Sequence, residues 1–346
     1  MTTENTTASA QPLPPDAYLL QLAFGPMVAQ ALYVAAKLGV ADHLAENPLP
    51  ISELAARTQT HERALYRILR SLASAGVFAE TDPNVFALTP CAELLRADVP
   101  NSMRNGVLFM GEEWHWRVWN DMLYSVQTGK PAWGHVHGAE VFDYFAANEE
   151  QSEIFNRAMT DGSIGIAPAI VESYDFSGCK TLVDIAGGHG YLLAQVLKAF
   201  PDIKGILFDV PAVINGAGAL LEKEGVATRV EKVAGDFFKA VPRGADAYMM
   251  KHIIHDWDDE RAIKILNSIH AAMPDDGKVL IIETVVPAGN EPHYSKVLDL
   301  EMLVSPGGLE RTAEEYRELL AAAGLRLTRI IPTPSPYSIV EAVKAR

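Results

Sequence analysis

Short apolar runs alternate with amphipathic helical segments in the second half of this chain, and this pattern constrains the fold more than any other feature. The runs cover residues 181–186, 204–210, 229–236, 245–254 and 278–283, and helical segments such as 191–200 and 259–273 lie between them. Apolar runs that are separated by helices are typical of a parallel sheet covered on both faces. We therefore predict a doubly wound, Rossmann-like α/β fold for this half.

Two further strand-like runs end the chain, at 327–331 and 337–343, with Pro332, Pro334 and Pro336 between them. Prolines interrupt regular structure and favour turns, so these runs predict a terminal hairpin. Such a hairpin would place one antiparallel strand in the otherwise parallel sheet.

The first half of the chain has an almost entirely helical pattern. Two short helices are expected at 51–56 and 61–75, and a small β-hairpin is expected at 77–80 and 85–88. A helix, a turn, a second helix and a hairpin in this order form the winged-helix arrangement, which is common among DNA-binding domains.

Arg63, Arg67 and Arg70 lie on the polar face of the second of these helices, where a DNA-binding protein would place them. The whole chain, however, has 29 Lys and Arg against 44 Asp and Glu, a net charge of −15. A chain this acidic is repelled by nucleic acid and by anionic lipid. We therefore expect no nucleic-acid partner, although a winged-helix regulator that senses a small ligand remains an alternative.

Residues 18–46 form a long, mostly apolar stretch that Gly25 and Pro26 interrupt. It has too few polar positions to face water on most sides, so it must be buried. A short N-terminal domain offers little core, and we expect an intersubunit contact here in preference to an intrachain one.

The remaining composition excludes several classes of protein. Apolar stretches of 18 residues are all broken by polar positions, which argues against a membrane span. The first residues show no secretory signal pattern, and 1–16 are expected to be disordered. Cys91 and Cys179 are the only two cysteines and stand far apart, so no disulfide framework is expected and a reducing cytoplasm fits.

A glycine-rich turn follows the first predicted strand, where Asp184 leads to Gly187, Gly188 and Gly190 and a helix opens. Glycines let the backbone approach a ligand closely, and the helix N-terminus offers free N–H groups. The last glycine of a dinucleotide-binding motif is replaced by Leu193, which points to a nucleoside without a diphosphate.

Two more polar positions end the next strands. Asp209 ends the second strand, where an acid can accept both hydroxyls of a ribose. Asp236 and Phe237 end the third, and offer a carboxylate and an aromatic wall for a base. Three such positions at successive strand ends predict a nucleoside site at this edge of the sheet.

His255 follows the fourth strand, and Glu283 ends the fifth. A carboxylate that accepts one ring N–H fixes the histidine tautomer and leaves the other nitrogen basic, so Glu283 is a candidate partner. Glu310 stands just before a helix whose expected capping box is Thr312 with Glu315. Spacing alone does not decide whether Glu310 is a solvated first-turn acid or part of the site.

These residues together resemble a known family. The segments LVDIAGGHG, FDVP, AGDFF, MMKHIIHDWDDE, LIIETVVP and GGLERT occur in this order along the chain. They resemble the S-adenosylmethionine-dependent O-methyltransferases of the plant caffeate and isoflavone type, whose bacterial relatives act on polyketides, phenazines and carotenoids. The similarity extends over nearly the whole chain, including a helical N-terminal dimerisation domain of winged-helix form.

The resemblance implies a division of the chain and a function. It implies a disordered tail at 1–16, a winged-helix dimerisation domain at 17–100, a helical acceptor-pocket region at 101–160 and a cofactor-binding domain at 161–346. It implies in-line methyl transfer from S-adenosylmethionine, which leaves S-adenosylhomocysteine, to a hydroxyl of an aromatic small molecule. It also implies a cytoplasmic homodimer that needs no metal.

The resemblance also implies roles for individual residues. The implied general base is His255, poised near neutrality, with Glu283, Glu310 and Asp256 beside it. The implied cofactor-binding residues are Met159, Ser163, Asp184, Gly187, Gly188, Gly190, Asp209, Val210, Asp236, Phe237 and Lys251. The implied acceptor-binding residues are Phe109, Trp114, Phe155, Met159, His252 and Met302.

Two departures from the family pattern bear on these expectations. Ala186 stands where the family has its first glycine, and a methyl group is tolerated there if φ is negative. The acceptor-side segment 302–308 is one residue shorter than in the plant enzymes and lacks their asparagine, so plant-type specificity is not expected. A relative that binds the cofactor but has lost methyl transfer, of the hydroxylase or decarboxylase type, is a further alternative.

Overall fold

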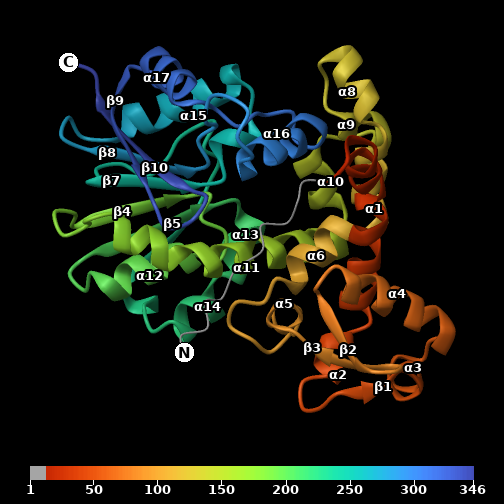
Figure 1. Cartoon of the computed structure of the whole chain (residues 1–346). Coiled ribbons are helices and arrows are strands. Elements are labelled where there is room, and N and C mark those ends of the chain that lie inside the picture. The colour runs from red at the N-terminus through yellow and green to blue at the C-terminus, as the bar shows by residue number, and fades with distance from the viewer. Residues whose placement is uncertain (1–12) are drawn as a thin grey trace, which may run out of the picture. The chain divides into compact units, whose positions relative to one another are not determined.

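The computed structural model describes residues 13–346, which form two compact units divided between Gly111 and Glu112 (Figure 1). Residues 1–12 of the predicted disordered tail lie outside the described residues. Pro15 and Asp16, the last residues of that predicted tail that are described as regular structure, belong to the first helix.

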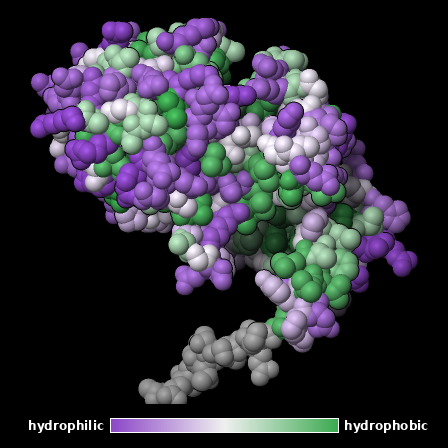
Figure 2. Space-filling model, turned by 90° about the horizontal axis from the view of Figure 1, so that it is seen from above, coloured by the Kyte–Doolittle hydropathy of each residue, from purple (hydrophilic) through white to green (hydrophobic). Residues whose placement is uncertain are grey.

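Helix α1, Pro15–Lys37, opens the N-terminal unit and continues through Gly25 and Pro26. The expected interruption is therefore wrong. A proline inside a helix removes one backbone hydrogen-bond donor, but α1 continues as one helix despite that loss. Its large apolar side chains are mostly exposed within this chain: Tyr18, Leu19, Leu20, Leu22, Phe24, Met27 and Val28. Figure 2 shows hydrophobic residues gathered beside the point where the grey residues join the described chain.

By length and composition alone, α1 could also cross a membrane. Its most apolar 18-residue window has a mean hydropathy of 1.5, and 11% of that window is buried. The polar breaks on which the sequence-based exclusion rested do not lower the average enough, so that exclusion was too strong. A single helix of this kind is weak evidence, because core helices and signal sequences pass the same test.

The rest of the N-terminal unit is the expected helix–turn–helix with a hairpin. Its elements are α2 Val40–His43, β1 Leu49–Pro50, α3 Ile51–Thr58, α4 Glu62–Ser74, β2 Phe78–Asp82, β3 Val85–Leu88, α5 Pro90–Glu93 and α6 Arg104–Gly111. The strands form a small antiparallel sheet in the order β1-β3-β2. Leu54, Leu65, Leu69, Leu72 and Phe86 form its fully buried centre.

The C-terminal unit begins with helices and continues as an α/β domain. The helices are α7 Glu113–Asn120, α8 Met122–Thr128, α9 Ala132–His137, α10 Val141–Ala147 and α11 Glu149–Ser173. The strands are β4 Thr181–Ile185, β5 Lys204–Asp209, β6 Val230–Ala234, β7 Ala247–Lys251, β8 Lys278–Glu283, β9 Leu325–Pro332 and β10 Ser338–Lys344. The later helices are α12 Tyr191–Ala199, α13 Pro211–Gly216, α14 Gly218–Lys223, α15 Asp259–Ala272, α16 Tyr294–Val304 and α17 Ala313–Ala322, with 3₁₀ turns η1 Ala227–Arg229 and η2 Ile254–Asp256.

The seven strands form one sheet in the order β6-β5-β4-β7-β8-β10-β9. Strands β6, β5, β4, β7 and β8 are parallel, whereas β10 runs antiparallel to both of its neighbours. Both the doubly wound sheet and its single antiparallel strand are as predicted from the sequence.

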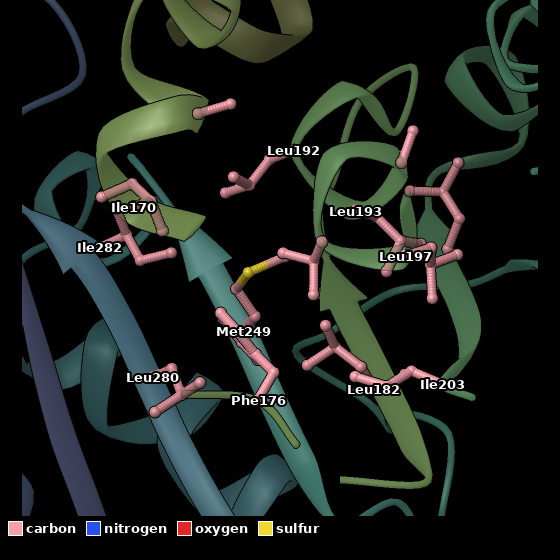
Figure 3. Close-up of a cluster of buried hydrophobic side chains, with 14 of the residues drawn as sticks. Ile170, Phe176, Leu182, Leu192, Leu193, Leu197, Ile203, Met249, Leu280 and Ile282 are labelled. Carbon is pink, nitrogen blue, oxygen red and sulfur yellow. The ribbon is translucent and has the colours of Figure 1, made fainter. Parts of the chain in front are cut away.

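Helices cover both faces of this sheet (Figure 1). Leu182 and Leu280 point to the face packed by α11 and α12, whereas their chain neighbours Val183 and Val279 point to the face packed by α15 and α17. Figure 3 shows Leu192, Leu193 and Leu197 of α12 above the strands. Burial on both faces explains why the strands are continuous apolar runs instead of alternating ones.

Candidate active site

The carboxyl ends of the parallel strands bring most of the sequence-predicted residues to one edge of the sheet. Asp184 lies near the end of β4, Asp209 at the end of β5 and Lys251 at the end of β7. Glu283 ends β8, and Asp236 lies two residues beyond Ala234, the last residue of β6. Ligands of open α/β sheets bind at this edge, where the order of the strands reverses.

The turn after β4 contains three glycines, each required by its surroundings or by its backbone conformation. A Cβ atom at Gly187 would lie 2.5 Å from the Asp184 carboxylate and 2.6 Å from Leu207, so only glycine fits there. Gly188 and Gly190 have φ values of +61° and +82°, which favour glycine. The turn is fixed to the end of β5, because the Gly187 N–H donates to the Phe208 carbonyl.

Ala186 adopts a left-handed conformation with φ of +51°. The condition under which its methyl group was expected to be harmless, a negative φ, is therefore not met. An L-residue in this region costs on the order of 1–2 kcal/mol relative to the right-handed region. The turn therefore carries local backbone strain at this position.

Asp209 is held by the turn itself. Its Oδ2 accepts the Gly188 N–H at 2.8 Å, and its Oδ1 accepts the Val210 N–H at 2.7 Å. Burial raises the pKa of Asp209, and these two hydrogen bonds oppose the rise. The carboxylate thus joins the end of β5 to the glycine turn.

The end of β6 presents an aromatic surface. Asp236 Oδ1 accepts the Phe238 N–H at 2.9 Å, which fixes the turn. The Phe237 ring packs edge-on against Phe238, with 4.8 Å between ring centres, and against Trp257 at 6.0 Å. Trp257 was not among the predicted site residues, although it follows His255 and Asp256 directly in the sequence.

Asp184 and Lys251 are groups of opposite charge on the neighbouring strands β4 and β7. Burial raises the pKa of Asp184 to about 7, an effect that Lys251 opposes. Burial lowers the pKa of Lys251 to about 8, although Asp184, Asp256 and Glu283 favour its charged form. Lys251 therefore links the predicted cofactor carboxylates electrostatically to those around His255.

Helix α11 carries the predicted methionine-end contacts. Ser163 Oγ donates to the Met159 carbonyl at 2.8 Å, so in this conformation its hydroxyl serves the helix. Thr160 and His189 Nδ1 lie within 3.4 Å of each other and connect α11 to the glycine turn. His189 occupies the variable position between the turn's glycines, where sequence reasoning gave it no role.

His255 and Glu310 form a buried pair. His255 Nδ1 donates to Glu310 Oε1 at 2.5 Å, and both residues are about 4% exposed. Thr284 donates to the other oxygen of Glu310. Asp299 Oδ1 accepts the Glu310 backbone N–H at 2.8 Å. Glu310 is therefore a buried partner of the histidine ring and not a solvated first-turn acid.

Glu283 does not hold the imidazole ring, contrary to the sequence-based expectation. Its Oε1 accepts the backbone N–H groups of Ile253 and His255, both at 3.1 Å, and its Oε2 accepts the Tyr316 hydroxyl at 2.5 Å. Glu283 therefore shapes the turn that carries His255, while Glu310 orients the ring. Spacing could not separate these roles because both acids lie near the same histidine.

The loop before Glu310 packs directly on the turn η2. Leu309 N–H donates to the His255 carbonyl at 2.9 Å. A Cβ atom at Gly308 would lie 1.9 Å from that carbonyl oxygen, so no other residue fits. Gly308, Thr284, Asp299 and Tyr316 all shape the site, but the sequence singled out none of them, although Gly308 lies in the GGLERT segment and Thr284 in the LIIETVVP segment.

Carboxylates dominate the surroundings of His255. Burial lowers the pKa of His255, but Asp256, the hydrogen bond to Glu310 and the charge of Glu283 outweigh it and raise the pKa to about 9. Burial raises the pKa of Asp256 to about 7, and Asp256 Oδ1 lies 3.5 Å from His255 Nε2. The pKa of His255 is therefore higher than the near-neutral value expected from the sequence.

His252 lies between His255 and Tyr337. Its ring centre is 4.8 Å from that of His255 and 4.7 Å from that of Tyr337. It has a left-handed φ of +56°, and its buried Nε2 has no hydrogen-bond partner in the structure. Burial, together with the charges of Lys251 and His255, holds the pKa of His252 well below its usual range, so the ring is neutral.

The remaining predicted acceptor residues belong to two different units, and two of them share one aromatic cluster. Phe109 lies in α6 of the N-terminal unit, whereas the others belong to the C-terminal unit. Trp114 packs among Trp133, Tyr144 and Phe145 and is 7% exposed. Phe155 of α11 stacks on Phe145 with 4.8 Å between ring centres.

Met302 adjoins a second buried polar pair that the sequence did not indicate. Glu301 of α16 lies 2.9 Å from His115 Nε2 and accepts the Trp119 N–H at 2.6 Å. These contacts fasten α7 to α16, the helix that also carries Asp299. Within residues 13–346, no group of three or more His, Cys, Asp or Glu side chains is arranged to hold a metal ion.

Comparison with known proteins identifies the family. Residues 119–326 match the family model of the O-methyltransferase domain, and residues 20–98 match that of the O-methyltransferase dimerisation domain. The chain belongs to the O-methyltransferase family. The dimerisation match includes most of α1, which explains the apolar surface of that helix better than a membrane span does.

Three relatives indicate the range of the family. The phenazine O-methyltransferase of Lysobacter antibioticus is 48% identical over 98% of this chain and 99% of its own. The 8-amino-8-demethylriboflavin N,N-dimethyltransferase of Streptomyces davaonensis is 36% identical over 91% of each chain. An O-methyltransferase from neocarzinostatin biosynthesis, solved with S-adenosylmethionine and 2-hydroxy-5-methyl naphthoic acid, is 31% identical with a TM-score of 0.81, over 97% of this chain and 100% of that one.

Proposed function

We propose that this protein transfers a methyl group from S-adenosylmethionine to a hydroxyl of an aromatic small molecule. The observation that carries the proposal is the buried His255–Glu310 pair, with 2.5 Å between Nδ1 and Oε1, at the sheet edge that also bears the glycine turn. Relatives that methylate a phenazine, or that bind a naphthoic acid with the methyl donor, support this choice of substrate class.

The residues at the sheet edge fit the methyl donor. The space beside Gly188 is open, because a Cβ atom there would meet nothing within 4 Å, and Asp209 lies beside this glycine to accept ribose hydroxyls. Asp236 and Phe237 would contact the adenine, with Trp257 behind them. Met159, Ser163 and Lys251 would surround the remainder of the molecule. The bound donor supplies a methyl group already activated by its sulfonium.

The protein must then align the acceptor oxygen and remove its proton. An aromatic hydroxyl has a pKa of about 10, so it is mostly protonated and a poor nucleophile at neutral pH. With Nδ1–H donated to Glu310, the neutral His255 has its lone pair on Nε2, where it takes this proton. General base catalysis of this kind contributes roughly 10²–10⁴ in rate, and alignment in a closed pocket contributes more.

The same geometry favours oxygen over nitrogen as the methylated atom. A family member from Streptomyces is an N,N-dimethyltransferase, so the fold alone does not decide this point. An aromatic amine already presents its lone pair and needs no base before attack, whereas a hydroxyl does. A buried base whose pKa is raised to about 9 nearly matches the pKa of an aromatic hydroxyl, about 10, and can take its proton.

Calorimetric titration with S-adenosylhomocysteine, with NAD as control, is the first test. Micromolar binding of the former alone is expected.

Phenolic, phenazine and polyketide acceptors are then screened with wild type and His255→Ala. The variant should lose methylation by about 10² or more while its cofactor affinity stays within a few-fold. Unchanged turnover in His255→Ala contradicts the proposed base, and absence of cofactor binding favours a ligand-sensing regulator, which a gel-shift assay at low salt would detect.

We also propose a cytoplasmic homodimer formed through the N-terminal unit. The match to the dimerisation domain and the exposed apolar side chains of α1 support it. Contiguous apolar surface of this kind marks a protein interface.

A further inference from the structure

Arg311 is a fully buried cation whose contacts converge on the turn that carries His255. Its Nη1 donates to the Ile254 carbonyl at 3.1 Å, and its Nη2 donates to the Trp257 carbonyl at 3.0 Å. These two carbonyls flank His255 and Asp256 in the sequence. One guanidinium therefore spans the whole η2 turn.

The backbone of Arg311 is fixed as firmly as its side chain. It follows Glu310 directly, and its carbonyl accepts the Val286 N–H at 3.0 Å just beyond β8. The main chain of Arg311 thus anchors Glu310, while its side chain anchors the turn of His255. Arg311 therefore anchors the backbone segments of both residues in the His255–Glu310 pair, whose side chains are 2.5 Å apart.

A buried charge is costly, and its presence here calls for a physical reason. Asp259, at the start of α15, compensates the guanidinium with contacts of 2.8 and 3.2 Å, but its own side chain is 68% exposed. An apolar side chain of similar volume would avoid the cost of desolvation. A guanidinium offers in return a rigid planar fork whose donors have fixed directions, which lysine lacks.

We propose that Arg311 is a positioning residue that sets the distance between His255 and Glu310. The inference rests on the proposed function, because it assumes that His255 is the base. Arg311 touches neither ring nor carboxylate of the pair. It acts through the two backbone segments that carry them.

The test uses the full-length protein and three arginine variants. Arg311→Lys keeps the charge and loses the fork, and Arg311→Ala is assayed with and without free guanidinium. The matched control is Arg229→Lys, because Arg229 also donates to three backbone carbonyls, those of Pro201, Ile203 and Leu197, but at the amino-terminal side of β6. Cofactor affinity is followed by titration with S-adenosylhomocysteine, and kcat is followed across pH.

We expect Arg311→Lys to bind S-adenosylhomocysteine like wild type while its kcat falls by on the order of ten- to a hundredfold. The acid limb of its pH profile should move to lower pH, because a looser Glu310 no longer favours the charged form of His255. The other groups that face His255, namely Asp256, Glu283 and His252, are unchanged in this variant. Guanidinium should restore part of the activity of Arg311→Ala.

Two outcomes overturn the proposal. An Arg311→Lys enzyme with wild-type kcat and an unmoved acid limb shows that the fork does not position the base. Equal losses in Arg311→Lys and Arg229→Lys, without a shift of the limb, show a purely structural role. If Arg311→Ala does not fold, Arg311→Lys still decides between these outcomes. Failure of the proposed function would instead appear as full turnover in His255→Ala.

Discussion

At the scale of single residues, the site depends on which carboxylate touches which part of His255. Glu310 holds the ring, Glu283 holds the backbone, and Asp256 faces Nε2 at 3.5 Å. Three acids around one imidazole favour its charged form, and their effect exceeds that of burial. His255 is therefore mostly protonated at neutral pH, and if it is the base, as proposed, activity should rise with pH.

A pH profile of wild type and Glu310→Gln tests this arrangement. Because the base acts in its neutral form, wild-type kcat/KM should rise between pH 7 and pH 9. Glu310→Gln removes both a charge and a hydrogen-bond acceptor, so the pKa of His255 should fall and the acid limb should move to lower pH. We expect kcat/KM at pH 9 to drop by on the order of 10².

The exposed acid Glu260 provides the control for that experiment, because Glu260→Gln changes the net charge equally without touching the site. An acid limb at the same pH in wild type and Glu310→Gln would contradict the assigned hydrogen bond.

At the scale of secondary-structure elements, helix α1 is the element whose apolar side chains remain largely exposed in the single chain. Apart from Ala35 and Ala36 at its end, its residues are exposed or only half-buried. Fully burying a large aliphatic side chain contributes about 1.5–3 kcal/mol. Burial of the exposed apolar side chains of α1 in an interface would therefore strongly favour association.

Replacing Leu19 and Met27 together by Glu should therefore dissociate the dimer. Both side chains are about 65% exposed in the single chain, and two buried charges would oppose association. Light scattering at micromolar concentration should report a dimer for wild type and a monomer for the double variant. Arg67→Glu on the exposed face of α4 adds charge elsewhere on the same unit and should stay dimeric. A monomeric wild type would refute the proposed interface.

At the scale of the whole molecule, a polar contact joins the last strands of the sheet to a distant part of the chain. Glu341 of β10 accepts hydrogen bonds from Tyr174, Thr328 and Arg329, and Lys278 of β8 lies 3.6 Å away. Burial opposes ionisation of Glu341, but these donors prevail and hold its pKa at about 2. The end of α11 is thereby tied to the last strands of the sheet.

This depressed pKa predicts a pH-dependent stability. A carboxylate whose pKa is lower in the folded state stabilises the fold above its unfolded pKa, here about 4.5, and loses that contribution as the pH falls towards 2. Glu341→Gln should therefore lower the urea midpoint at pH 7, and the gap to wild type should narrow below pH 4.5. Glu318→Gln on α17 is the control. A gap that does not change with pH would assign the effect to packing alone.

The sequence by itself determined the class of fold, the strand ends at which the polar residues lie, and the family. Apolar runs between helices identify a parallel sheet because strands buried on both faces have no polar side, and the last two runs identify its antiparallel strand. Asp209, His255 and the glycine turn were placed correctly at the sheet edge because parallel strands end together there.

Only the tertiary structure decided which groups meet across that edge. It assigned the imidazole to Glu310 instead of Glu283, gave Ala186 a positive φ, and brought Arg311 beneath the turn of His255. Residues 255 and 310 are joined by the folding back of the loop after α16, which no local periodicity encodes. Local sequence patterns indicate which faces of a helix or strand are buried. Contacts between residues far apart in the sequence depend instead on how the helices and strands pack together.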